Sequence, residues 1–552
     1  MTGPGIRGAH FVLAFSGGEK ALMISPSCFS RRRNPVLLAV LLLVCLGFMP
    51  GRALAGSHGG PAASTWMSAQ ATGNGEDPWA EEGSTEEDPW ADTEASGSQE
   101  DPWGEESGEE ASPWQEEEDR EETAEIPWAE TPTEEKSPFE LSGRLWNRMS
   151  YDVNEDTRFE DDGFNHAELH LYGAYDPGQG VDMLMSVDVD QFQYYNSGHW
   201  DNETNVRVHE AYVRLSRRWF ELTLGNQFVR WGKIDQVSPL DIVNPEDTRD
   251  GLVRSREERK LPIPMVDLKL FKGLYKLEAL FIPFFQESKL NLAGRDWALF
   301  DHYEQSVGSF RIEENDPPND LEHSEFGLRF AGTFRKLDYA LSYFRTREDL
   351  PSIRSLNVPP GFRVQDPDSA TVEDLARFAV LTGQPIPLGY RRQHVYGMEF
   401  ETTWRDFGIR GDFAYIDKCS FLNERLQQVL KPAFHYAVGI DYSRPGSFYA
   451  NLQFSQQWIR HFEDGLLFAD DVTNTVNGKV TKELWDSKLE LTLRYLYNFT
   501  REDYYINPLM TLKYWQSLTL QLGVEFEGGP DESTLGLYDD NDEVYFIFKY
   551  HF

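Results

Sequence analysis

The sequence predicts an all-β protein: a transmembrane antiparallel β-barrel of about 18 strands, with 16 as the alternative, behind a disordered acidic N-terminal segment. Three observations carry this prediction. The chain begins with an export signal, residues 141–552 alternate apolar and polar side chains in strand-length runs, and the final strand ends on an aromatic residue. A period of two is the pattern of barrel strands that face lipid on one side and water on the other.

Residues 1–55 have the pattern of a secretory signal peptide. Three arginines at 31–33 precede an apolar run at 36–48, and Ala-Leu-Ala follows at 53–55. A positive region, a short apolar region and a small-residue cleavage site together direct export. The signal is complete from Met23, which we expect to be the start of translation.

Residues 56–140 form an acidic segment that we expect to be disordered and periplasmic. Residues 72–140 carry 26 Asp and Glu against two basic residues, a net charge of −24, while the whole chain has −40. The segment has too few apolar residues for a core, and its Pro-Trp units are spaced too irregularly for a solenoid. Two interpretations stay open: a solvated spacer, and a multivalent ligand for a periplasmic protein. The docking candidates are Trp79, Trp90, Trp103, Trp114 and Trp128.

Residues 141–552 are predicted to form the barrel itself. Runs such as 181–189, 489–497 and 518–526 place apolar residues on one face and polar residues on the other. Eight brief turns alternate with longer polar connections, the longest near 231–263, 285–322 and 347–393. Outer-membrane barrels have short periplasmic turns and long extracellular loops. A soluble β-sandwich would not need this alternation.

The last strand has an apolar, aromatic outer face and a more polar inner face. It resembles the closing strand of Gram-negative outer-membrane barrels, and an even strand number returns it to the periplasmic side, next to the strand near residue 142. We expect the outer-membrane assembly machinery to recognise its outward aromatic residues, Phe548, Tyr550 and Phe552.

A motif between residues 220 and 250 resembles a family of outer-membrane barrels known as domain-of-unknown-function family 1302. Alginate-export barrels are similar at a greater distance. The resemblance implies a porin-like barrel over about three-quarters of the chain, and it implies no particular substrate. The matching residues are Gly225, Gln227, Trp231, Gly232, Lys233, Asp235, Gln236, Ser238, Pro239, Asp241, Asn244, Pro245, Asp247 and Arg249.

The connection that contains this motif is the predicted pore constriction. It is rich in turn-forming residues and in both charge signs, and a loop folded into a wide barrel is a common way to make it selective. The alternatives are a surface lid in which Lys233, Asp241, Asp247 and Arg249 pair with one another, and a loop that bridges strands. The candidate constriction residues are Lys233, Asp235, Asp241, Asn244, Asp247, Arg249, Arg254 and Arg256.

The predicted lumen face also carries both charge signs, with acids in the majority. This balance favours cations or neutral polar solutes, although inward charges also pair across strands. The predicted lumen charges are Asp182, Asp188, Asp190, Glu210, Arg214, Glu221, Glu490 and Arg494.

The sequence contains no nucleophile elbow, zinc-protease motif, phosphate loop or paired-cysteine metal motif. We therefore predict no enzymatic activity, cofactor or metal, and the acidic composition predicts no nucleic-acid partner. The leading hypothesis is an outer-membrane channel for passive passage of small hydrophilic solutes, in contact with membrane lipid and lipopolysaccharide. The alternatives are a non-conducting barrel that anchors a periplasmic interaction segment, and an export barrel for a polymer or solute.

Overall fold

The computed structural model describes residues 137–153, 163–196, 199–300, 310–444 and 446–552. The signal peptide predicted at 1–55 lies outside the described residues, as do the five docking tryptophans and almost all of the acidic segment predicted at 56–140.

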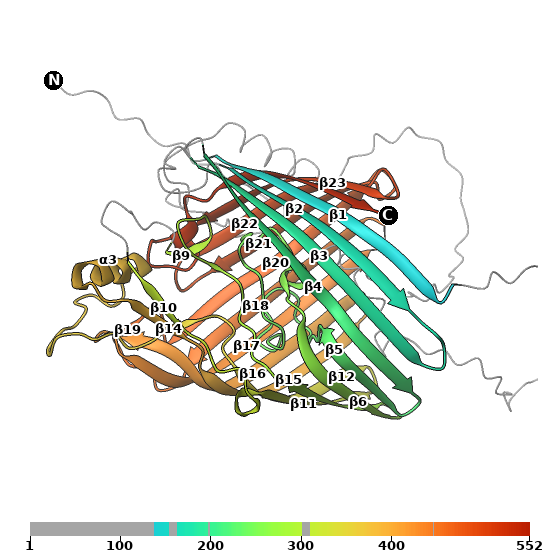
Figure 1. Cartoon of the computed structure of the whole chain (residues 1–552), viewed down its shortest axis with the longest axis horizontal. Helices are drawn as coiled ribbons and strands as arrows, with labels where there is room; N and C mark the ends of the chain where they lie inside the picture. Colours follow the sequence, from blue (N-terminus) through green and yellow to red (C-terminus); the bar gives the residue numbers. More distant parts are fainter. Residues whose placement is uncertain (1–136, 154–162, 197–198, 301–309, 445) are drawn as a thin grey trace, which may run out of the picture.

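Within the described residues, eighteen antiparallel strands form a closed barrel, which confirms the predicted fold class and strand number. Each barrel strand pairs with the next barrel strand along the chain, and the last pairs with the first. Figure 1 shows the barrel from the side. In order around the ring, the strands are β1 (Phe139–Asp152), β2 (Gly163–Tyr175), β3 (Val181–Asn196), β4 (His199–Arg217), β5 (Phe220–Gln227), β6 (Ile263–Lys272), β7 (Tyr275–Ile282), β11 (Glu325–Phe334), β12 (Leu337–Arg347), β15 (Arg392–Trp404), β16 (Phe407–Asn423), β17 (Gln428–Arg444), β18 (Phe448–Ile459), β20 (Val472–Leu484), β21 (Leu489–Asn498), β22 (Asp503–Leu512), β23 (Leu518–Gly528) and β24 (Glu543–His551).

The last strand shows the alternation that the sequence predicts. Phe546 and Tyr550 are 39% and 42% exposed on the outer face of β24, whereas Tyr545 and Ile547 are 1% and 4% exposed on its inner face. Phe552 lies just beyond the strand and exchanges two backbone hydrogen bonds with Gly143, at 2.8 and 2.9 Å. The sheet therefore closes at the position that the sequence indicates.

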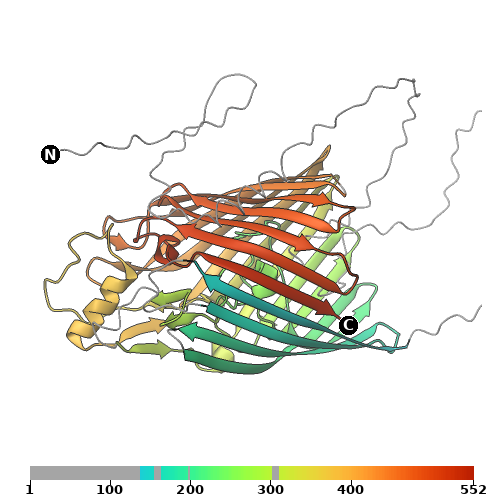
Figure 2. The same ribbon diagram turned by 90° about the horizontal axis from the view of Figure 1, so that it is seen from above.

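The two ends of the barrel differ, as Figure 2 shows. All eight predicted short turns lie at one end, where the C-terminus also lies. The first strand begins at Phe139, two residues before the expected boundary, and the carbonyl of Pro138 accepts a hydrogen bond from the N–H of Asp176 at 2.8 Å. The acidic segment therefore joins the barrel at the short-turn end.

The opposite end carries a cap built from the long connections. The β7–β11 and β12–β15 connections share a small sheet of β10 (Ile312–Asn315), β14 (Ile386–Gly389) and β13 (Ser352–Ile353), which packs with helix α3 (Val372–Thr382). Shorter elements complete this end: β8 (Asn291–Ala293), β9 (Ala298–Phe300), η3 (Leu321–His323), β19 (Leu466–Leu467) and η4 (Gly536–Tyr538). The short helix α2 (Arg256–Arg259) belongs to the β5–β6 connection.

The sequence analysis did not anticipate helix α3. A capping box of Thr371 and Asp374 starts it, and Gly383 ends it in the left-handed region at φ 67°. The capping box and Gly383 can be read in the sequence, but they involve only a few residues, whereas the barrel pattern extends over residues 141–552. Among the described residues, no helix is long and apolar enough to cross a membrane.

Deletion of Phe552 should reduce the yield of folded barrel. The deletion removes both backbone hydrogen bonds to Gly143 and the ring that lies against that glycine, so the seam between β24 and β1 loses its last pair. Heat-modifiable electrophoretic mobility and surface yield measure the effect, and a His551→Gln variant that keeps Phe552 is the control. Unchanged mobility and yield would remove this role from Phe552.

Candidate functional site

The connection between β5 and β6, residues 228–262, lies inside the barrel and is here called the lumen strap. Its two ends are tied together by Asn244, which is 2% exposed. The side-chain Oδ1 of Asn244 accepts from the N–H of Val229 at 2.8 Å, and its Nδ2 donates to the backbone carbonyls of Gln227 (3.1 Å) and Leu261 (2.9 Å). This predicted constriction residue therefore fixes the base of the strap.

The strap meets the barrel wall first at β15 and β16, which we call the first junction. The Asp412 carboxylate, fully buried on β16, accepts from the backbone N–H groups of Lys233 and Ile234, each within 3.0 Å, and from the Ser238 hydroxyl at 2.6 Å. On β15, Glu399 accepts from the N–H of Gly232 at 2.8 Å. Two buried wall carboxylates thus hold one backbone turn of the strap.

Gly232 is required at this turn for two reasons. Its φ of 94° lies in the region that favours glycine. A Cβ on Gly232 would also lie 2.7 Å from a carboxylate oxygen of Asp412, inside contact distance. The glycine therefore allows the strap backbone to approach the wall.

An apolar patch on the inner wall packs against the strap beside the first junction. Trp231, Leu240 and Val243 of the strap are each 2% exposed. The sequence analysis assigned polar character to the inner face and missed this patch. The signal was present, because the ends of β6 and β7 are apolar on both faces. The wall residues of the cluster are Ile263, Met265, Leu280, Ile282, Phe344, Val395, Ala414 and Ile416.

The strap then crosses to β1, β2 and β24, which form the second junction. β16 is the ninth strand after β2 in a ring of eighteen, so the two junctions lie on opposite walls. The Asp250 carboxylate lies 2.7 Å from Nδ1 of His166 on β2, whose Nε2 lies 3.0 Å from Asp190 on β3. Arg148 of β1 donates to the Asp250 carbonyl at 2.8 Å.

Arg254 and Glu258 complete the second junction. The Arg254 guanidinium pairs with Glu168 at 2.9 Å and lies 4.0 Å from the ring centroid of Trp146. Glu258 pairs with Lys549 of β24 at 3.2 Å. Burial would raise the pKa of Glu258, but the Lys549 ammonium and the Arg254 guanidinium outweigh it and lower this pKa to about 2. The Glu258 carboxylate is therefore charged throughout the physiological pH range.

The strap is also braced internally. Glu246 pairs with Arg256 at 2.7 Å and Arg259 at 3.3 Å, and Lys260 pairs with Asp241 at 3.2 Å. Burial opposes ionisation of Glu246, but the nearby cations lower its pKa to about 2. Burial also opposes charge on Asp250, and His166, Arg254 and Arg148 reverse the effect, so the pKa of Asp250 lies below its ordinary range.

The predicted constriction residues take different places in this arrangement. The expectation that Lys233, Asp241, Asp247 and Arg249 pair with one another holds for Asp247 with Arg249 at 2.7 Å, whereas Lys233 pairs with Glu401 of β15 at 3.0 Å. The eight residues divide into Lys233 and Asp235 at the first junction, Asp241, Asn244 and Arg256 within the strap, and Asp247, Arg249 and Arg254 towards the second junction.

The predicted lumen charges also divide into two sets. Three of them contact the strap directly or through one other residue. Arg494 donates to the Val253 carbonyl of the strap at 2.7 Å. Asp190 binds His166, which contacts Asp250, and Asp188 binds Arg207, which lies 3.6 Å from Asp247. Glu221 pairs with Lys269, Glu490 with Lys513, and Asp182 is the register partner of Arg214. The backbone N–H of Glu210 donates to the Ser186 hydroxyl at 3.0 Å.

The docking residues that the sequence analysis missed all lie on barrel strands. Each is an inward polar residue in an ordinary alternating strand, so no local signal separates it from other lumen residues. They are Arg148, His166, Glu168, Glu399, Asp412 and Lys549.

Three of the second-junction residues, His166, Glu168 and Asp190, place their ligand atoms within 4.8 Å of one another. The donor set does not fit a cation, because Arg144 and Arg254 already pair with Glu168 and both ring nitrogens of His166 are engaged. The cluster therefore acts as an ion-pair network that holds the strap.

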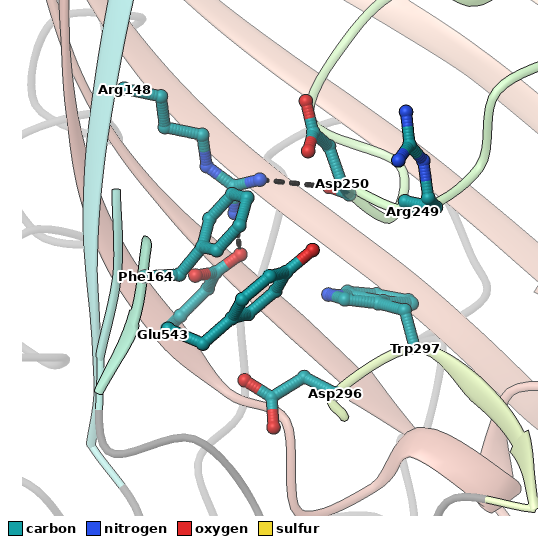
Figure 3. Close-up of a pocket in the computed structure, with 8 residues that line it drawn as sticks. Arg148, Phe164, Arg249, Asp250, Asp296, Trp297 and Glu543 are labelled. Atoms are coloured by element: carbon teal, nitrogen blue, oxygen red, sulfur yellow. Dashed lines mark hydrogen bonds and ion pairs between the residues drawn. The ribbon is translucent and has the colours of Figure 1, made fainter. Parts of the chain in front are cut away.

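Figure 3 shows a small cavity beside the second junction. It has about 10 Å³ of space, enough for roughly one water molecule. The ring of Trp297 reaches it from the β7–β11 connection and lies against Gly251 of the strap, so a side chain on Gly251 would displace it. The strap therefore leaves little free volume at this wall. Other lining residues are Arg148, Phe164, Tyr194, Arg249 and Asp250.

Solved structures of similar fold are outer-membrane proteins. OccAB4 of Acinetobacter baumannii is 10% identical with a TM-score of 0.43, over 76% of this chain and 99% of that chain. OccK7 (OpdD) of Pseudomonas aeruginosa is 11% identical with a TM-score of 0.39, over 75% and 98%. OmpF of Salmonella typhi, in complex with daunomycin, is 10% identical with a TM-score of 0.37, over 75% and 97%.

No curated protein matches the chain. A family model described as a protein of unknown function, DUF1302, matches residues 139–487, more than half of the chain and including the whole lumen strap. The resemblance carried by the motif at 220–250 is thereby confirmed, and the chain belongs to the DUF1302 family of outer-membrane β-barrels.

Proposed function

We propose that this protein is an outer-membrane channel for passive passage of small hydrophilic solutes, with the lumen strap as its constriction. The observation that carries the proposal is the docking of one long connection on opposite walls of an 18-stranded barrel. Barrels of 16 to 18 strands enclose an aqueous lumen unless something fills it. A strap fixed at both walls narrows that lumen.

We place the protein in the outer membrane of a Gram-negative bacterium, with the short turns and the N-terminal segment in the periplasm. Short turns face the periplasm in barrels of this class, and the acidic segment joins the barrel at that end. The outward apolar band supports contact with lipid, and the long connections support contact with lipopolysaccharide at the cell surface.

Charges near the first junction support a preference for cations or neutral solutes. Arg410 of β16 lies within 3.3 Å of three carboxylates, those of Asp235, Glu401 and Asp441. Lys233 and Arg230 are the other cations of this cluster, and Glu257 pairs with Arg230 at 2.9 Å, so four negative charges face three positive ones. The partial exposure of these side chains keeps them in contact with water in the lumen.

A second candidate is a non-conducting barrel that anchors the acidic segment. The close packing of the second junction favours it, because the cavity there holds roughly one water and Asp190 and Asp412 are fully buried. Conductance separates the two candidates.

Replacement of residues 232–258 by a short Gly-Ser linker should raise the single-channel conductance several-fold and weaken cation selectivity. The linker cannot reach either junction, so the full lumen opens. Planar-bilayer recordings and reversal potentials in a salt gradient measure both effects. Deletion of 366–369, in the cap, is the control and should leave both unchanged. A strap-deleted barrel that folds but still does not conduct would rule out the channel.

An Asp412→Ala substitution should release the strap from the first junction. It removes the acceptor of three donors, and hydrogen bonds to a charged group contribute about 1.5–3 kcal/mol each. We expect the open-channel current to become noisier, because the turn at Lys233 is no longer fixed to the wall. Asp412→Asn, which keeps an acceptor oxygen, should be milder, and Asp406→Ala in an exposed turn is the control. Open-channel noise equal to that of the wild type would contradict the docking role.

The strap should stay docked from pH 7 to pH 5 and loosen in stronger acid. The pKa of Glu246 and of Glu258 falls from 4.5 to about 2 in the docked state. Their contribution to docking is therefore complete above pH 4.5 and is lost progressively as the pH falls towards 2. Conductance should be flat between pH 7 and 5 and rise below pH 4.5. A Glu258→Gln variant should show a smaller rise, and a rise that begins near neutral pH would contradict this assignment.

A further inference from the structure

The eight short turns are basic, although the protein as a whole is acidic. Residues 176–180, 217–219, 272–274, 335–336, 405–406, 444–447, 485–488 and 513–517 contain nine basic residues and three acidic ones, a net charge of +6 against −40 for the chain. We call the basic residues the collar: Arg217, Arg218, Lys272, Arg335, Lys336, Arg405, Arg444, Lys488 and Lys513.

All nine collar side chains are exposed. Among the described residues, Arg218, Lys272, Lys336 and Arg444 take part in no ion pair. Arg335, Arg405 and Lys488 lie over the rings of Phe334, Trp404 and Tyr514, at 5.4, 5.1 and 5.2 Å from the ring centroids. The rings hold these cations at the rim without neutralising their charge.

Two of the neighbouring acids already have partners. Asp338 accepts from the Thr333 hydroxyl at 2.6 Å, and Glu483 accepts from the Ser487 hydroxyl at 2.5 Å. Lys513 forms an ion pair with Glu490, which lies inside the barrel mouth. Most of the collar charge is therefore available to an anionic partner at the short-turn end.

The chain's own acidic segment joins the barrel at this end. The carbonyl of Pro138 accepts a hydrogen bond from Asp176 in the β2–β3 turn, and residues 72–136 carry 25 acidic and two basic residues, a net charge of −23. A flexible chain of 65 residues, the length of 72–136, has a root-mean-square span of about 45 Å. An 18-stranded barrel is roughly 35 Å across, from the strand spacing and tilt. A segment of this length reaches every short turn.

We propose that the collar binds this acidic segment, residues 72–136, across the short-turn mouth of the barrel. Carboxylates pair with the collar ammonium and guanidinium groups, and the tryptophans of the Pro-Trp units stack on collar arginines. Each contact is weak, but the covalent link holds the segment near the collar at a high effective concentration. The occupant of the collar is thus part of the same molecule.

Phospholipid headgroups are the competing occupant. Aromatic side chains beside the collar mark the membrane interface, where lipid phosphates also lie. The tethered segment is favoured because it brings its acids to the collar whatever the lipid composition. If the leaflet beside the short turns is anionic, its lipids repel the acidic segment, and binding to the collar opposes this repulsion.

An endoprotease specific for glutamate tests the proposal on the full chain in a neutral detergent, where no anionic lipid is present. At low salt, cleavage within 72–136 should be several-fold slower in the wild type than in a variant with Arg218→Gln, Lys272→Gln, Lys336→Gln and Arg444→Gln. Roughly 0.5 M NaCl should abolish the difference, because it screens exposed charges beyond a few ångströms. The matched control neutralises four exposed cations of the opposite end, Arg363, Arg377, Lys418 and Arg425, and should behave as the wild type.

A distance measurement gives a second readout. Spin labels at Ser112→Cys and Gln516→Cys, in a Cys419→Ser background, should show a short-distance population at low salt that the collar variant lacks. Equal cleavage rates and equal distance distributions in wild type and collar variant would overturn the proposal. If, in that case, vesicles containing phosphatidylglycerol bind the wild type and not the collar variant, the collar serves lipid headgroups instead.

Discussion

The pairing of β24 with β1 is the constraint on which the rest of the structure depends. A sheet in lipid cannot leave an unpaired edge, because each buried backbone group without a partner costs several kcal/mol. Closure over nine residue pairs, and over the further pair of Gly143 with Phe552, removes both edges at once. It also fixes which face of every strand is inside, so the side chains that hold the strap owe their direction to this seam. A ring of eighteen strands then leaves a lumen wide enough to need a constriction.

The constriction is held by two kinds of interaction that depend on each other. The apolar contacts of Trp231 and Leu240 with the inner wall exclude water from the first junction. In that dry environment the Asp412 carboxylate would be costly without donors, and the strap backbone supplies them. The apolar patch therefore positions the N–H groups, and the buried carboxylate makes any other position of the turn unfavourable. At the second junction, ion pairs and the His166 bridge hold the strap beside a smaller apolar cluster that includes Val253 of the strap.

The sequence predicted the fold well because the barrel is encoded locally. Alternation along each strand, the eight turns and the aromatic end are all visible within short windows, and neighbouring strands pair in chain order. The docking of the strap is not local. Lys233 and Asp412 are separated by 179 residues, and their contact joins the β5–β6 connection to β16, the fifth strand after β6 in the ring. The charged residues of the strap stand out in the sequence as a group, but no pattern in the sequence shows that Lys233 pairs with Glu401 while Asp247 pairs with Arg249.

Charge is distributed unevenly in this chain, and its sign differs from one part of the chain to another. Acids dominate the N-terminal segment, both signs are paired along the strap and its walls, and bases line the short turns. Paired charges inside the lumen cannot attract the segment strongly, since each already has a close partner. The collar has few such partners, so its positive charge is available to attract the segment. Binding there would place a negative layer at the mouth nearest the Arg410 cluster, and both would raise the local concentration of cations entering the lumen.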